Sequence, residues 1–118
     1  MIKTLVRKYR LQKEDTEKRA VFITFTKPIL RSHLSSCERS LLGLIRKDFN
    51  AYIFSFNDPG LINAQVLKLL LRFNNSCGRR SGLLAINGAR EVIAISGLSE
   101  IFATGENERS ILHALART

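Results

Sequence analysis

The chain has 118 residues, of which 45% are hydrophobic and 25% are charged. This length and composition are typical of one globular domain with its own core, and they exclude a disordered chain and a small disulfide-stapled scaffold. No apolar run approaches the roughly 20 residues that a membrane span needs. The N-terminus, MIKTLVRKYR, lacks the apolar core and cleavage site of a signal peptide. We therefore expect a single cytoplasmic domain over residues 1–118.

The net charge of +9 is unevenly distributed. Residues 1–19 carry seven basic and three acidic side chains, and residues 20–47 carry five and one. Residues 81–118, with three and four, are nearly neutral. Such a field favours an anionic partner, which could be an acidic protein surface, nucleic acid or anionic lipid. The alternative is a solubilising surface without a specific target.

The first half of the chain predicts a hairpin followed by a helix. Residues 2–11 and 20–26 are β-favoured and alternate in polarity, with a charged turn at 13–18, so residues 1–19 form a basic strand and hairpin region. Ser35 and Glu38 are spaced as a capping box at the start of the helix. That helix buries residues three and four apart, namely Leu34, Cys37, Leu41, Leu44 and Ile45.

The middle of the chain adds a strand and a second helix. Residues 51–56 (AYIFSF) are a clear strand, and the next four residues, NDPG, break it. A helix then runs over residues 62–75, with Lys68 and Arg72 four apart on its polar side. Strands that alternate with helices from Ala20 onward predict right-handed crossovers and a mostly parallel sheet. An opening hairpin gives that sheet a mixed edge.

The last part of the chain has a compact order of elements. Residues 83–86 are an apolar strand, Asn87-Gly88 is a turn, and residues 89–96 form a short helix that Gly97 ends in the left-handed conformation. Residues 101–103 form another apolar run around Phe102, and Asn107 caps a final helix. That helix buries Ile111, Leu112 and Leu115.

This order, written in the sequence INGAREVIAISGLSEIFATGENERSILHAL, resembles the C-terminal half of the STAS family, the domain of bacterial anti-sigma-factor antagonists. The matching features are Gly97-Leu98, Phe102 and the helix around Leu112, and the resemblance extends weakly back to about Val21. It implies an α/β fold: a single STAS-like domain with a mostly parallel, mixed central sheet and amphipathic helices.

No catalytic or metal-binding constellation is found in the sequence, and we expect no enzyme activity, cofactor or metal. His33 and His113 lie far apart without an evident carboxylate partner, and no nucleotide-binding or hydrolase motif occurs. Cys37 and Cys77 fall on apolar helix faces, which indicates buried free thiols. Asp58 follows a strand, where α/β sites gather, but the simpler interpretation is a turn residue that bonds its own backbone.

The resemblance implies a site at the start of the second helix. The family usually has an Asp-Ser pair there, and phosphorylation of the Ser by a partner kinase releases the antagonist from its complex. Here Asn63 stands at the Asp position and Ala64 at the Ser position, so the usual phosphorylation cannot occur. Modification of Ser55 or Ser76 is the alternative. The predicted docking residues are Asn57, Asp58, Asn63, Ala64, Gln65, Lys68 and Arg72.

The resemblance predicts a non-catalytic protein-interaction module of the partner-switching type, which acts in signal transduction and the regulation of transcription. Its partner would be an anti-sigma factor or related kinase. One alternative is an accessory subunit that binds the ATPase of an ABC lipid transporter. The other is a basic protein that binds nucleic acid or anionic lipid, which is disfavoured because the aromatic residues fall in core-like strands. No membrane span is expected, and the sequence does not decide whether the protein forms a homodimer.

Overall fold

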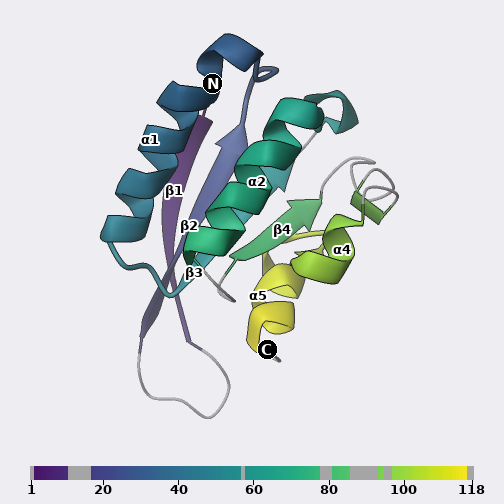
Figure 1. Ribbon diagram of the computed structural model, residues 1–118. Coiled ribbons are helices and arrows are strands. Elements are labelled where there is room, and N and C mark those ends of the chain that lie inside the picture. The colour runs from purple at the N-terminus through teal and green to yellow at the C-terminus, as the bar shows by residue number, and fades with distance from the viewer. Residues whose placement is uncertain are drawn as a thin grey trace.

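A computed structural model of the protein describes residues 2–10, 17–56, 58–77, 81–85, 93–94 and 97–116. The strands are β1 (Ile2–Tyr9), β2 (Lys18–Phe25), β3 (Ala51–Phe56), β4 (Ser81–Ala85) and β5 (Ala103–Gly105). The α-helices are α1 (Leu34–Arg46), α2 (Ala64–Cys77), α4 (Leu98–Ile101) and α5 (Glu108–Ala116). Two 3-10 turns, η1 (Arg31–His33) and η2 (Pro59–Leu61), precede α1 and α2. Figure 1 shows their arrangement. None of the helices in these ranges is long and apolar enough to cross a membrane.

The five strands form one sheet in the order β1-β2-β3-β4-β5. β1 and β2 are antiparallel, with Ile2 opposite Phe25 and Tyr9 opposite Lys18, and every other pair is parallel. The predicted hairpin and mixed sheet are therefore confirmed. Most of the predicted turn at residues 13–18 lies outside the described residues, and β2 starts two residues earlier than expected, at Lys18.

The two faces of the sheet are buried against different helices. Alternate residues of β2 and β3 belong to one large core with α1 and α2: Val21, Ile23, Phe25, Tyr52, Phe54 and Phe56. The intervening residues belong to a smaller core around Ile111 of α5: Ala20, Phe22, Ala51 and Ile53. Figure 1 shows α1 and α2 side by side across the same face. This alternation is the period of two that the strand sequences predict.

Aromatic side chains join four parts of the chain in the large core. The Phe54 ring of β3 lies 6.1 Å from that of Phe25 in β2, 5.0 Å from Phe73 in α2 and 6.3 Å from Phe102 near the C-terminus. The last two pairs meet edge to face, a preferred geometry for aromatic rings. Phe102, one of the residues that carry the family resemblance, is therefore a core residue.

The capping box predicted at Ser35 and Glu38 is wrong. The α-helix begins at Leu34, so Ser35 lies inside its first turn, and the preceding residue, His33, provides no side-chain cap. Instead, the His33 ring Nδ1 accepts the Leu30 N–H at 3.1 Å and fixes the 3-10 turn before the helix. Because the 3-10 turn η1 runs directly into α1, the helix begins before Ser35. Glu38 instead pairs with Arg72 of α2.

The C-terminal elements follow the predicted order with one correction. Gly97 has φ +78°, in the left-handed region, and the Asn107 Oδ1 accepts the Ser110 N–H at 2.9 Å as the predicted cap of α5. Ile101 closes the short helix α4 and does not start a strand; β5 begins at Ala103. The predicted Asn87-Gly88 turn lies outside the described residues, as does most of the predicted helix at 89–96, of which positions 93 and 94 are helical.

Gly97→Val is expected to lower the free energy of unfolding by about 1 kcal/mol or more. The cause is backbone strain alone, because a Cβ at this position meets no atom within 4 Å. Chemical denaturation of the Gly97→Val and Gly97→Asn proteins measures the effect, and Asn, which tolerates this conformation, should cost less. Equal stabilities for the Val variant and the unmodified protein would show that Gly97 is not left-handed in solution.

Candidate docking surface

The predicted site lies at the carboxyl ends of β2 and β3. The loop after β2 leads into α1, and the loop after β3 leads into α2, so both helices begin at the same edge of the sheet (Figure 1). Ligand-binding loops of open parallel sheets gather at this edge, because each strand delivers its following loop there. Asn57 lies outside the described residues, and the other six predicted docking residues can be placed.

Asn63 connects the two loops. Its side-chain Oδ1 accepts the Val66 N–H at 3.0 Å, which satisfies a free donor in the first turn of α2. Its Nδ2 donates to the Ile29 carbonyl at 3.2 Å, on the loop after β2. An ionised Asp, the usual residue of the resembled family, could cap the helix but could not donate to Ile29. The amide therefore serves both contacts.

Asp58 has the turn function that the sequence favoured. Its Oδ1 accepts the Gly60 N–H at 2.9 Å, and Pro59 occupies the first position of η2. This local bond occupies one carboxylate oxygen and holds the chain as it turns from β3 toward α2. Asp58 remains exposed at the edge of the site.

Ala64 is the first residue of α2, and its side chain is exposed. Lys68 and Leu71 lie four and seven residues after Ala64, on the same side of the helix, and Leu71 is 43% exposed. The outward side of α2 thus presents a small residue at its start, then a cation, then an apolar side chain. All three side chains are exposed and therefore accessible to a partner.

Gln65 points inward from the first turn of α2. Its side-chain Oε1 is buried and has no hydrogen-bond partner among the described residues. A buried acceptor of this kind lowers stability by about 1–3 kcal/mol when it stays unpaired. Gln65 therefore contributes little to an exposed docking surface in this conformation, in contrast to its neighbour Ala64.

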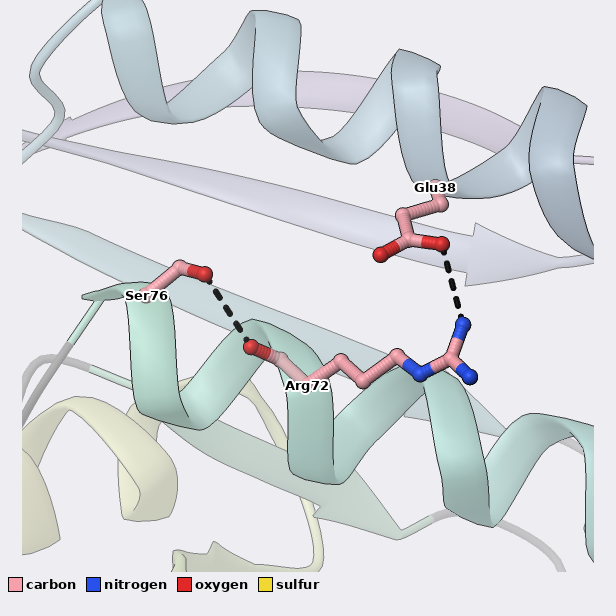
Figure 2. A network of polar contacts seen from close by, with 3 residues as sticks. All are labelled: Glu38, Arg72 and Ser76. Atoms are coloured by element: carbon pink, nitrogen blue, oxygen red, sulfur yellow. Dashed lines mark hydrogen bonds and ion pairs between the residues drawn. The ribbon is translucent and has the colours of Figure 1, made fainter.

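Arg72 is directed toward α1. Its guanidinium Nη1 lies 3.1 Å from Oε2 of Glu38, and the Ser76 hydroxyl donates to the Arg72 carbonyl at 3.2 Å (Figure 2). The Arg72 side chain is 57% exposed, so the pair contributes at most about 1 kcal/mol to stability. Lys68 and Arg72 therefore differ: Arg72 joins the two helices, whereas no described acidic side chain pairs with Lys68.

Three exposed residues that the sequence did not single out for the site lie on the loop after β2 and in η1. Leu30 is 56% exposed, and Lys27 and Arg31 flank it. The Asn63–Ile29 bond brings this segment to the start of α2. We call six exposed residues the α2 docking surface: Lys27, Leu30, Arg31, Ala64, Lys68 and Leu71. Its three cations form no ion pair with a described acidic residue.

The two cysteines and the two serines considered as alternative phosphorylation sites are not part of the α2 docking surface. Within the described ranges, no three His, Cys, Asp or Glu side chains are placed to hold a metal ion. Cys37 and Cys77 are buried and are not in a disulfide, and burial raises the pKa of the Cys37 thiol, which favours its neutral, unreactive form. Ser55 is 7% exposed within β3, whereas Ser76 is exposed in the last turn of α2.

The fold matches that of a solved structure, the crystal structure of an anti-sigma factor antagonist from Mycobacterium paratuberculosis. The TM-score is 0.69 at 18% sequence identity, and the match covers 98% of this chain and 95% of that chain. The predicted α/β fold with a mixed sheet is therefore confirmed as the fold of an anti-sigma factor antagonist. No protein-family description matches the sequence. No curated protein matches it either.

Proposed function

We propose that the protein is a non-catalytic interaction module that binds an acidic protein partner through the α2 docking surface, as a relative of partner-switching anti-sigma-factor antagonists. The observation that carries this proposal is the exposed start of α2, which Asn63 ties to the loop after β2. The fold supports it, because the matched structure is that of an anti-sigma factor antagonist. On this proposal the protein acts in the cytoplasm.

The charge of the surface supports an acidic partner. Lys27, Arg31 and Lys68 are exposed, and no described carboxylate pairs with them. Leu30 and Leu71 add apolar area that a protein partner could bury at about 25 cal/mol per Å². A nucleic acid would use the cations but would gain little from the two leucines. A protein partner of the anti-sigma-factor or kinase type uses both.

The usual serine switch is absent from this proposed mechanism. Ala64 has no hydroxyl, and Ser55 is enclosed in the sheet, where a kinase cannot reach it without unfolding β3. Ser76 lies at the opposite end of α2 from the docking surface. A phosphate at the start of a docking helix adds close to two negative charges, which is how the switch works in the resembled family. Without it, binding is controlled by the amount or state of the partner.

The proposal is tested by affinity capture from the source cell followed by rate measurements. Mass spectrometry identifies the retained protein, and surface plasmon resonance then measures its association with the unmodified protein and two variants. Lys68→Glu should slow association roughly three- to tenfold, with a smaller loss at high salt, because an exposed cation acts mainly by long-range attraction. Arg109→Glu, the same charge change at an exposed residue of α5, should have much less effect.

The outcomes separate the alternatives. Retention of an anti-sigma factor or kinase, with the loss confined to Lys68→Glu, supports the proposal. Retention of an ABC-transporter ATPase would indicate the accessory-subunit function on the same fold. Equal losses from both variants, with nucleic acid or ribosomes retained, would show attraction by net charge and contradict the proposal.

A further inference from the structure

The outer edge of the sheet is formed by β1, whose only partner among the described strands is β2. In such an antiparallel pair, every second residue directs its backbone N–H and C=O away from the neighbour. β1 is 8 residues long and pairs with β2 in continuous register, without a bulge or a proline. A bulge and a proline are two of the devices that blunt a sheet edge. β1 has a third, its Lys and Arg side chains, which repel a like-charged strand but leave the backbone groups that β2 does not pair accessible to an acidic one.

Two apolar side chains lie at the centre of this edge. Leu5 is 51% exposed and Val6 is 46% exposed. Leu5 is paired with Phe22, on the sheet face that α5 covers, and Val6 is paired with Val21, on the face of α1 and α2. Leu5 and Val6 therefore lie beyond the two cores, one on each face of the sheet, and an added strand could cover both.

The charges along β1 determine which kind of strand could be added at this edge. Lys3, Arg7 and Lys8 lie in β1, Arg10 follows it, and residues 2–10 include no acidic residue. Arg7 is paired with Glu108 at 3.3 Å and Lys8 with Glu17 at 3.6 Å, whereas no described carboxylate pairs with Lys3 or Arg10. A second copy of β1 would bring the same cations together along one seam, which is destabilising. A strand with acidic residues near Lys3 and Arg10 is complementary.

We infer that β1 is a second binding edge, to which an acidic, extended segment of a protein partner adds as a sixth strand. The segment has adjacent apolar residues opposite Leu5 and Val6 and acidic residues toward both ends. Backbone hydrogen bonds give the binding energy of such strand addition, and the side chains set its specificity. This edge is separate from the α2 docking surface, and the inference does not depend on that proposal.

The probe is a synthetic extended peptide of the same length as β1, with two adjacent valines flanked by glutamates. Its control is the same peptide N-methylated at alternate residues, which keeps every charge but removes the backbone donors on one edge. Heteronuclear NMR titration and amide hydrogen exchange are recorded on the full chain. We expect shifts and added exchange protection at alternate amides of Ile2–Tyr9, and at least tenfold weaker binding of the methylated peptide.

Two double variants test the charges. Lys3→Glu with Arg10→Glu should weaken peptide binding about tenfold or more, whereas Arg39→Glu with Arg109→Glu, an equal change in net charge at two exposed residues outside β1 and the α2 docking surface, should leave it within twofold. Far-UV circular dichroism checks that both variants are folded. The inference is overturned if both peptides bind equally, if both double variants lose binding equally, or if a single-stranded DNA protects β1 as well as the acidic peptide does.

Discussion

Phe54→Ala is expected to destabilise the fold by about 3–5 kcal/mol, the usual cost of removing a fully buried phenyl ring. The Phe54 side chain is 0% exposed and contacts the rings of Phe25, Phe73 and Phe102. Its removal leaves a cavity where β2, β3, α2 and the C-terminal segment meet. Because a domain of this size has only about 5–15 kcal/mol of stability, much of the protein could be unfolded at 37 °C. Urea denaturation followed by circular dichroism measures the loss.

Two further variants separate the ring contacts from general core volume. Phe54→Leu keeps most of the volume and should cost less than half as much as Phe54→Ala. Ile53→Val, on the opposite face against α5, should cost about 0.5–1.5 kcal/mol. A loss below 1 kcal/mol for Phe54→Ala would be incompatible with its place at the centre of the large core.

Asn63→Ala is expected to cost about 2 kcal/mol, because one side chain makes two contacts that both disappear. Loss of the cap on the Val66 N–H costs about 1 kcal/mol, and the Ile29 carbonyl loses its bond to the amide at a similar cost. The same change frees the loop after β2 from α2, so binding of a partner to the α2 docking surface should weaken beyond the change in stability. Thermal unfolding and binding calorimetry measure the two effects.

Asn63→Asp is the matched control. The carboxylate still accepts the Val66 N–H and is favoured at a helix N-terminus, but it cannot donate to Ile29 when ionised. Its cost should therefore fall below that of Asn63→Ala. If the Asp variant were as unstable as the Ala variant, the contact with Ile29 would be the dominant one, and if neither lost stability, Asn63 would not connect the loops in solution.

The elements that the sequence predicted are those with a local signal. The alternation in AVFITFT and AYIFSF separates the two faces of β2 and β3, and this is why both cores were foreseeable. Gly97 and Asn107 were also predictable, because a left-handed helix stop and an N-cap depend on the residue type at one position. The resemblance to the STAS family supplied the overall topology that local patterns leave open.

Features that depend on tertiary contacts were not predictable from local patterns. Glu38 matches a capping box in spacing, but it pairs with Arg72 on a neighbouring helix. Tertiary packing therefore overrides the local preference at Glu38. Ile101 differs, because it continues an apolar run but completes the short helix that starts after Gly97, and it is 49% exposed.

The candidate site was predicted in part. The position of Ala64 at the start of α2 follows from aligning the helix with the family pattern, and the structure places Ala64 there. Leu30 was missed because its exposure results from the η1 turn and the bond between Asn63 and Ile29, residues 34 apart in sequence. A hydrophobic residue in a basic loop is the only sequence signal that could have indicated it.

The most direct test of the α2 docking surface uses isothermal titration calorimetry. It measures the affinity of the captured protein partner for the unmodified chain and for the Ala64→Ser and Ala64→Glu variants. Glu at the first position of α2 suits the helix dipole, so the melting temperature should hold or rise slightly. Its charge and bulk stand where the family's phosphate would, so Ala64→Glu should weaken binding at least tenfold, whereas Ala64→Ser should bind like the unmodified protein. Unchanged affinity for a folded Ala64→Glu protein would show that the start of α2 is not the docking surface.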